Sequence, residues 1–259
     1  MFDILYKKRI VNPHIEELKK FGEYSNKLHI KKKILSSNIS NLNCSKLLGE
    51  YNSFDEINID ELPECFVIKT SHFCGDSRVI KSKEDFKKNY NNLKNHFNNT
   101  LKTIYRNGDE PHYKYIKPEL FIEEYLEGLV YDYKFNCIHG EVALIMILND
   151  KTHEFYNYSI DWKPLRVIRS NNKLLVKNIK KPEKLQDMLE IAKKLSKEYD
   201  YVRIDLYEIN NKIYFGEYTF TPGGCIYPYF QPIQFENILS KFYNEKKIDY
   251  DLINKYFLL

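Results

Sequence analysis

The sequence predicts an α+β fold. Helical and strand patterns follow one another in mixed order, and several neighbouring strands are joined by tight turns into antiparallel hairpins. Neither an internal repeat nor a flexible linker is visible. At 259 residues the chain fits one large domain or two small ones folded against each other.

The composition is that of a globular protein. Hydrophobic residues make up 43% and aromatic residues 15% of the chain, enough for a sizeable core. The net charge of +4 is small and scattered, which argues against a nucleic-acid partner. The five cysteines form no C-x-x-C pair, so neither a zinc cluster nor a disulfide framework is indicated. No apolar run approaches the roughly 18 residues of a membrane span, and a soluble, cytoplasmic protein is expected.

The first half of the chain begins with a polar helical region at residues 1–60, where Ile15, Leu18 and Phe21 have helical spacing. The basic run Lys31–Lys33 is interpreted as a solvated helix face; contact with an anionic sugar or membrane is the alternative. The elements expected next are a strand at Phe66–Lys69, a loop at Thr70–Ser77, a partner strand at Arg78–Ile80, a helix at 82–106 and a loop at Asn107–Pro111.

The second half is richer in strands. Its expected elements are a strand at Leu120–Glu124, a hairpin of Tyr131–Ile138 with Glu141–Leu148 around His139-Gly140, a helix at Pro182–Tyr199, and a hairpin of Tyr201–Glu208 with Lys212–Phe220 around Asn210-Asn211.

The last of these hairpins carries polar residues two apart on both strands. Arg203 and Asp205 share one face of their strand, and Glu217 and Thr219 share one face of the other. The hairpin is expected to bring Asp205 near Glu217 and Arg203 near Thr219. Such a group is costly to bury, and Mg²⁺ bridging to phosphate oxygens would offset that cost.

An ordinary solvated sheet face is the alternative interpretation, and composition alone favours it. The Thr-Pro-Gly-Gly sequence at 221–224 shifts the balance, because it places a tight turn directly behind the acidic strand. Arg203 would then stabilise a phosphoryl group in transfer.

Arg-x-Asp followed by Glu-x-Thr-x-Thr-Pro-Gly-Gly resembles the metal-binding end of ATP-grasp ligases. The form with threonines is similar to the TupA-like ATP-grasp family of polysaccharide and teichuronopeptide biosynthesis. The resemblance continues upstream through LPECFVIKTSHFCGD, FIEEYLEG and DYKFNCIHGEV, and covers roughly residues 45–230. It implies an ATP-grasp fold with two lobes of mixed or antiparallel sheet plus helices, and with the nucleotide between them.

The resemblance also implies roles for residues of the first lobe. Lys69 would contact the nucleotide phosphates, although a lysine at a strand end is often simply exposed. The loop Thr70–Ser77 would cover the phosphates, with Gly75 as its one glycine and His72 as a phosphate contact. The segment Glu123, Glu124, Tyr125 and Leu126 matches the hinge whose backbone groups hold the adenine.

In the second lobe, Asp132 is the candidate for the ribose contact and Lys134 for a second phosphate contact; a plain cross-strand ion pair is the alternative for both. The resemblance implies that Asp205 and Glu217 are magnesium ligands and that Glu217 bridges two ions. Thr219 stands where many ATP-grasp ligases have asparagine, a better metal ligand than a hydroxyl. Arg203 and Lys134 would be the catalytic cations.

The domains expected are an N-terminal helical region (1–60), a small lobe with the phosphate loop (61–125) and a large lobe with the metal site (126–259). The function implied is ATP-dependent carboxylate–amine ligation through an acylphosphate, with ATP and Mg²⁺ as cofactors. The substrate would be a uronic-acid sugar or another sugar-linked or small-molecule carboxylate, together with an amine, and polysaccharide-assembly enzymes are the expected partners. A small-molecule kinase and a non-catalytic polysaccharide-binding protein are the alternatives.

Overall fold

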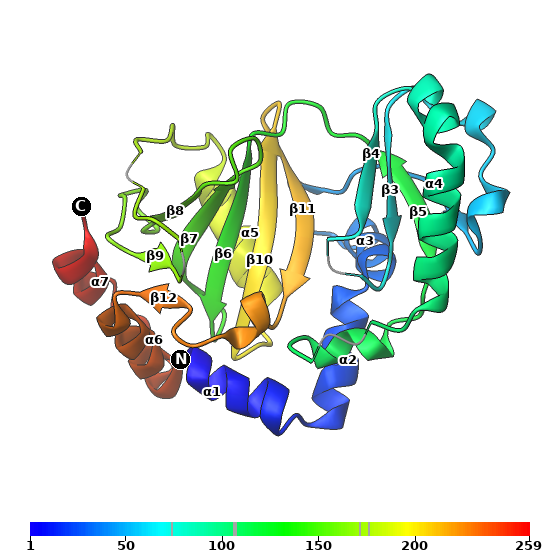
Figure 1. Ribbon diagram of the computed structural model, residues 1–259. Helices are drawn as coiled ribbons and strands as arrows, with labels where there is room; N and C mark the ends of the chain where they lie inside the picture. Colours follow the sequence, from blue (N-terminus) through cyan, green and yellow to red (C-terminus); the bar gives the residue numbers. More distant parts are fainter. Residues whose placement is uncertain (74, 106–107, 171, 176) are drawn as a thin grey trace. The chain divides into compact units, whose positions relative to one another are not determined.

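The computed structural model describes residues 1–73, 75–105, 108–170, 172–175 and 177–259 (Figure 1). It mixes helices with antiparallel and mixed sheets, which confirms the α+β class. The chain divides into two compact units. Unit 1 comprises Met1–His14, Asn38–Asn43 and Gly128–Leu259, and unit 2 comprises Ile15–Ser37 and Cys44–Glu127. Three positions of the expected elements, Cys74, Arg106 and Asn107, lie outside the described residues.

Unit 1 is built on a six-stranded sheet in the order β1-β11-β10-β6-β7-β8, in which β1 pairs with β11 in parallel and the other pairs are antiparallel. A small ladder of β9 and β12 accompanies it. The strands are β1 (Leu42–Asn43), β6 (Tyr131–Ile138), β7 (Glu141–Asn149), β8 (Phe155–Tyr158), β9 (Ile168–Arg169), β10 (Tyr201–Ile209), β11 (Lys212–Thr219) and β12 (Phe230–Gln231).

Helices pack on both faces of this sheet. α5 covers one face, where the sulfur of Cys137 lies 4.0 Å from the carbonyl oxygen of Ala192 (Figure 1). On the other face the ring of Tyr201 packs edge-on against Phe2 of α1. The helical segments are α1 (Phe2–Tyr6), the π-helix η1 (Lys7–Val11), α5 (Leu185–Ser196), the 3-10 turn η5 (Pro222–Cys225), α6 (Ile233–Glu245) and α7 (Tyr250–Phe257).

Both predicted tight turns of unit 1 are present. Positive φ angles at His139 and Gly140 (48° and 82°) join β6 to β7, and those at Asn210 and Asn211 (51° and 59°) join β10 to β11. The β10–β11 register contains one irregularity: Leu206 pairs with Phe215 but Asp205 pairs with Glu217, so Gly216 is skipped. A β-bulge therefore shifts the rest of β11 by one residue.

Unit 2 is built on a four-stranded antiparallel sheet in the order β2-β5-β3-β4. The long helix α4 packs on one face of this sheet. There Phe86 and Phe97 of the helix form one buried cluster with Ile68 and Ile122 of the sheet. Its elements are α2 (Ile15–Ser25), α3 (Lys27–Leu35), β2 (Leu47–Tyr51), η2 (Phe54–Glu56), η3 (Ile59–Glu61), β3 (Phe66–Thr70), β4 (Ser77–Ile80), α4 (Lys83–Lys102), η4 (Pro111–Tyr115) and β5 (Leu120–Glu124).

The helical expectation for residues 1–60 is wrong from Leu42 onward, where β1 and β2 form. The two strands lie at sheet edges, where tertiary pairing decides the structure of short segments. Two helices are shorter than expected: α4 begins after its N-cap Ser82 and ends at Lys102, and α5 begins at Leu185, three residues after Pro182. Among the described residues, no helix has both the length and the apolar character of a membrane span.

Candidate functional site

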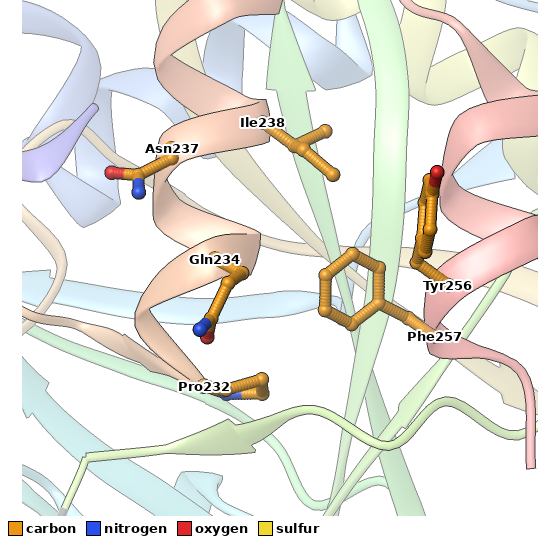
Figure 2. Close-up of a pocket in the computed structure, with 6 residues that line it drawn as sticks. All are labelled: Pro232, Gln234, Asn237, Ile238, Tyr256 and Phe257. Carbon is orange, nitrogen blue, oxygen red and sulfur yellow. The ribbon is translucent and has the colours of Figure 1, made fainter.

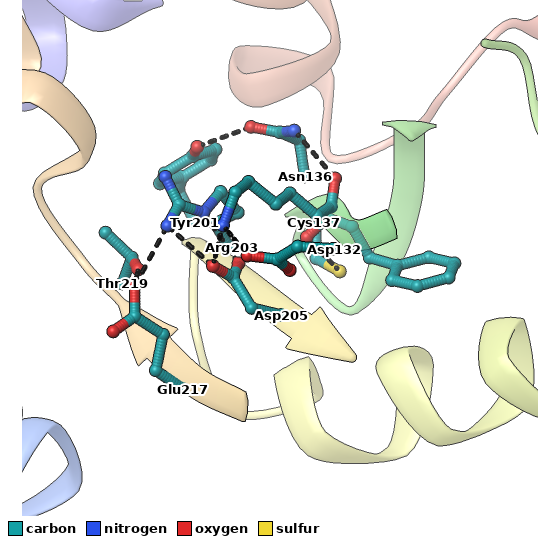
Figure 3. A network of polar contacts seen from close by, with 10 residues as sticks. Asp132, Asn136, Cys137, Tyr201, Arg203, Asp205, Glu217 and Thr219 are labelled. Atoms are coloured by element: carbon teal, nitrogen blue, oxygen red, sulfur yellow. Dashed lines mark hydrogen bonds and ion pairs between the residues drawn. The ribbon is translucent and has the colours of Figure 1, made fainter. Parts of the chain in front are cut away.

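The main polar cluster of unit 1 lies on three neighbouring strands, on the sheet face opposite α5 (Figure 3). The register pairs Asp205 with Glu217 and Arg203 with Thr219, as the hairpin geometry predicts. Across β6, Arg203 pairs with Asn136 and Asp205 pairs with Lys134. The cluster consists of Asp132, Lys134 and Asn136 of β6, Arg203 and Asp205 of β10, and Glu217 and Thr219 of β11.

Arg203 is the centre of the hydrogen bonding in this cluster. Its Nε donates to Asp205 Oδ1 and its Nη2 to Asp205 Oδ2, both at 2.7 Å, while Nη2 also lies 3.1 Å from Glu217 Oε1. The Thr219 hydroxyl donates to the same Glu217 oxygen at 3.0 Å. One guanidinium thus fixes two carboxylates on adjacent strands.

Lys134 joins a third carboxylate to this arrangement. Its ammonium donates to Asp205 Oδ2 at 2.5 Å and also to Asp132 Oδ2. The other Asp132 oxygen, Oδ1, is buried and has no hydrogen-bond partner among the residues that the structure describes. Asp132 is therefore the least well compensated acid of the cluster.

Burial affects the pKa values of Asp132, Asp205 and Lys134 differently. Burial raises the pKa of Asp132 to about 7, because Lys134 is shared with Asp205 and only partly offsets the loss of water. Burial by itself would also raise the pKa of Asp205, but the positive charges of Arg203 and Lys134 outweigh burial and lower the pKa of that carboxyl. Lys134 has a raised pKa, because Asp205 and Asp132 outweigh its burial. A proton taken up by the cluster is expected at Asp132 first.

The acids of the cluster could bind magnesium together with a phosphate ligand. Within the described ranges, no group of three or more His, Cys, Asp or Glu residues is arranged to hold a metal ion by itself. Magnesium is commonly held by one or two carboxylates together with substrate phosphates and water. Asp205 and Glu217 supply two carboxylates at paired positions, with the Thr219 hydroxyl beside them. This donor set fits magnesium that is held jointly by the protein and a phosphate ligand.

A second polar cluster lies in unit 2 and centres on Glu123. This carboxylate is buried on β5, and its two oxygens pair with different lysines: Oε1 with Lys69 of β3 at 2.5 Å, and Oε2 with Lys31 of α3 at 2.8 Å. Burial would raise the pKa of Glu123, but Lys69 and Lys31 together lower it to about 2. The Glu123 side chain is therefore an anion held between two cations.

Lys31 and Asn136 are polar members of the two clusters that the sequence analysis did not select. The interpretation of Lys31–Lys33 as a solvated face is wrong for Lys31, which is buried, and holds for Lys32 and Lys33, which are exposed. One turn of helix after Lys27, Lys31 falls among the buried positions Leu28, Ile30 and Ile34 of α3, a periodicity that could have identified it.

The loop between β3 and β4 is anchored by its polar side chains. Asp76 accepts hydrogen bonds from Thr70 at 2.8 Å and pairs with His96 Nε2 of α4 at 2.6 Å. His72 is buried, with its Nε2 within 3.2 Å of the carbonyl oxygens of Thr100 and Thr103, so its ring is directed at the end of α4. Gly75 has a φ of 69° and open space around it.

The segment expected to hold adenine follows β5. Glu124 ends the strand, and both its backbone N–H and its side chain bond to Lys46, at 2.9 and 2.7 Å. Tyr125 is exposed and Leu126 is partly exposed, and neither belongs to a helix or strand. The chain passes from unit 2 to unit 1 two residues later, between Glu127 and Gly128.

A cavity of about 480 Å³ lies elsewhere in unit 1, between α6 and α7. Figure 2 shows Ile238 and Phe257 directed into the space between these helices. It is lined by Pro232, Gln234, Asn237, Ile238, Tyr256 and Phe257. None of the predicted site residues lines it.

Comparison with known families gives one match over most of the chain. The model of the family described as TupA-like ATPgrasp matches residues 7–243. A search of the curated proteins finds no significant match.

Comparison with solved structures gives several matches at low identity and with TM-scores below 0.5. D-alanine–D-alanine ligase from Bacillus anthracis, complexed with ATP, is 15% identical over 80% of this chain and 56% of its own, with a TM-score of 0.46. Phosphoribosylamine–glycine ligase from Thermotoga maritima is 13% identical over 90% of this chain and 57% of its own, with a TM-score of 0.48. N5-carboxyaminoimidazole synthetase from Staphylococcus aureus, complexed with ADP, is 13% identical over 75% of this chain and 43% of its own, with a TM-score of 0.45. The chain therefore spans about half the length of these structures.

Proposed function

This chain belongs to the TupA-like ATP-grasp family, and on that premise we propose that it joins a carboxylate to an amine at the expense of ATP. The observation that carries this proposal is the partly buried cluster in which Arg203 fixes Asp205 and Glu217 on adjacent strands. Opposed carboxylates with an adjacent guanidinium suit a metal-bound phosphoryl group.

The proposed reaction has two steps. An oxygen of the substrate carboxylate attacks the γ-phosphorus of ATP, and the bond from that phosphorus to the β–γ bridging oxygen breaks, releasing ADP and leaving an acylphosphate. The amine nitrogen then attacks the acyl carbon; the bond from that carbon to the phosphate oxygen breaks, phosphate leaves, and the nitrogen loses a proton to give the amide. Both steps depend on positioning and on the balance of charge more than on covalent help from the protein.

Residues of unit 1 would handle the transferred phosphoryl group. Asp205, Glu217 and Thr219 would hold magnesium, which supplies charge neutralisation for the phosphate oxygens when bound. Arg203 and Lys134 would be the catalytic cations. In the structure both donate hydrogen bonds to Asp205, and a phosphate bound beside Asp205 would interact with the same two positive charges. Asp132 would contact the ribose, for which its unpartnered Oδ1 offers an acceptor.

Residues of unit 2 would bind the rest of the nucleotide. Lys69 would contact phosphate oxygens, and the loop around Gly75 would offer backbone N–H groups. His72 was expected to contact a phosphate, but its ring is buried with Nε2 at the carbonyl oxygens of Thr100 and Thr103, so its proposed role is to support that loop from inside. The segment Glu123, Glu124, Tyr125 and Leu126 would hold the adenine through its backbone.

The substrates are proposed from the family alone. A uronic-acid sugar in capsular or envelope polysaccharide biosynthesis would bring the carboxylate, and an enzyme that consumes ATP for this purpose would act in the cytoplasm beside polysaccharide-assembly enzymes.

The proposal is tested by calorimetry of ATP binding with and without Mg²⁺, on the wild type and on Glu217→Gln. Metal-dependent binding that is weakened in this variant supports the site, and Glu141→Gln, an exposed acid of the same sheet, should bind like the wild type. Wild-type protein that is folded but binds no ATP would leave a non-catalytic binding protein as the better description.

A screen of carboxylates and amines for ADP release then tests the reaction itself. Ligation requires that ADP release depend on both substrates and that an amide accumulate. A phosphorylated product formed without any amine would instead identify a small-molecule kinase.

A further inference from the structure

The ammonium group of Lys31 has no hydrogen-bonding capacity left for a ligand. It lies on α3 with a side chain only 8% exposed. Its Nζ contacts Glu123 Oε2 at 2.8 Å, the Ser45 carbonyl oxygen at 2.8 Å and the Ser45 hydroxyl at 2.5 Å. A lysine ammonium has three N–H groups, and these three acceptors use all of them.

Lys69 is in a different situation. Its side chain is 29% exposed, and Glu123 is the only ion-pair partner that the described part of the chain gives it. Two of its three N–H groups therefore remain for other acceptors. The two lysines and the single carboxylate together carry one net positive charge, and Lys69 is the exposed member that can present it.

The geometry points to Lys31 as a positioning residue for ATP. We infer that Lys31 neutralises Glu123, so that Glu123 holds the Lys69 side chain in place without cancelling its charge toward the phosphates. This inference rests on the proposed function. Without Lys31, Glu123 would pair with Lys69 alone, and the net charge of the group would fall from one to zero.

Replacing Lys31 by methionine removes the charge and keeps an unbranched side chain that is one atom shorter. Removing one positive charge from the group that faces the phosphates should raise the Kd for Mg-ATP about tenfold. Attraction between a phosphate and even a screened charge changes the affinity by about that factor. The effect should decrease in the order ATP, ADP, AMP, and adenosine should bind as to the wild type. Lys32→Met is the matched control, because Lys32 is the next residue of α3 and pairs with Glu50 at the surface.

The double variant Lys31→Met, Glu123→Gln separates charge balance from packing. It removes one positive and one negative charge, so the net charge of the group returns to that of the wild type. The Kd for Mg-ATP should then return to within about threefold of the wild-type value, as expected when two charges act as one unit. Because the double variant leaves no buried acid without its partner, it also answers the question if Lys31→Met alone does not fold.

Calorimetry of the four proteins with ATP, ADP, AMP and adenosine distinguishes the outcomes. Folded Lys31→Met protein that binds ATP like Lys32→Met, or that loses affinity for adenosine as much as for ATP, would overturn the positioning role. So would a folded double variant without recovered ATP binding. If the wild type binds ATP and Lys31→Met is unaffected, only this inference fails; if the wild type binds no nucleotide, the proposed function fails with it.

Discussion

Arg203 and Asp205 lie two residues apart on β10 and are joined by two parallel hydrogen bonds of 2.7 Å, with the Arg203 Nη2 group shared with Glu217. The pair is buried, and its geometry depends on the planar fork of the guanidinium. A lysine at position 203 would keep the charge and lose the fork.

We therefore expect Arg203→Lys to lower the rate of ADP release at saturating substrates by about 100-fold, the usual cost of removing one fixed donor to a developing charge. Steady-state kinetics with varied ATP would show the loss mainly in kcat. Lys212→Arg, an exposed exchange of the same two residue types on β11, is the control. A rate for Arg203→Lys within twofold of the wild type would contradict the role.

A second ion pair anchors the N-terminal segment of unit 1. Arg9 is buried, and its guanidinium donates to Asp200 Oδ1 at 2.5 Å and to the carbonyl oxygens of Phe220 and Tyr201. Replacing it by methionine should lower the free energy of unfolding by about 3 kcal/mol, since the two carbonyl acceptors stay buried and Asp200 loses one of its two cations. Lys8→Met removes the exposed partner of the same Asp200 and should cost less than about 1 kcal/mol. Urea unfolding measures both, and equal losses would refute the distinction.

Glu123 gives a prediction for acid stability. Lys69 and Lys31 overcome the effect of burial and lower the pKa of this carboxyl to about 2, whereas glutamate in an unfolded chain has a pKa of about 4.3. Because the unfolded state binds the proton more tightly, the contribution of Glu123 is fully present above about pH 4.3 and is lost as the pH falls toward 2.

Glu123→Gln should therefore reduce the steepness with which the unfolding free energy falls between about pH 5 and pH 2.5. Glu50→Gln, which removes an exposed acid paired with Lys32, should keep the wild-type slope. Urea midpoints at a series of pH values give the comparison, and identical slopes for the two variants would speak against the coupling.

Gly216 gives a prediction for the bulge in β11. A Cβ atom at this position would lie 3.0 Å from the carbonyl oxygen of Asp205 and 3.0 Å from the ring of Tyr207. Gly216→Ala should cost about 2 kcal/mol of stability through this crowding and should also weaken Mg-ATP binding by displacing Glu217. Gly108→Ala, in open space, should leave both unchanged. A stable Gly216→Ala variant with normal ATP affinity would show that the bulge tolerates a side chain.

The sequence predicted the family, the fold class and both tight turns of unit 1 correctly, because these depend on local residue types. It also predicted that Asp205 faces Glu217. A two-residue turn at Asn210-Asn211 alone would instead place Gly216 opposite Asp205 and Glu217 on the α5 face. The bulge that corrects this depends on contacts between strands, which alternation along one strand does not reveal.

Lys31 was missed for a related reason. Its neighbours Lys32 and Lys33 are solvated, and three consecutive lysines resemble a surface face. The position of Lys31 among the buried residues of α3 was the available signal, and the pairing with the buried Glu123 carboxylate is what the sequence does not reveal. The roles assigned to the site residues stay predictions until nucleotide binding is measured.

The register of β11 has a consequence for how the chain can change in length. Deleting Gly216 would only remove the bulge and would keep Glu217 opposite Asp205. Side chains alternate between the two faces of a strand, so deleting one residue at the Asn210-Asn211 turn, with the bulge kept, would exchange the faces of everything that follows on β11. Glu217 and Thr219 would turn toward α5, and Tyr218 would take their place. Deletions or insertions of two residues at the Asn210-Asn211 turn preserve the faces. Length variation at this turn should therefore be tolerated in even steps and should abolish function in odd ones while the bulge is present.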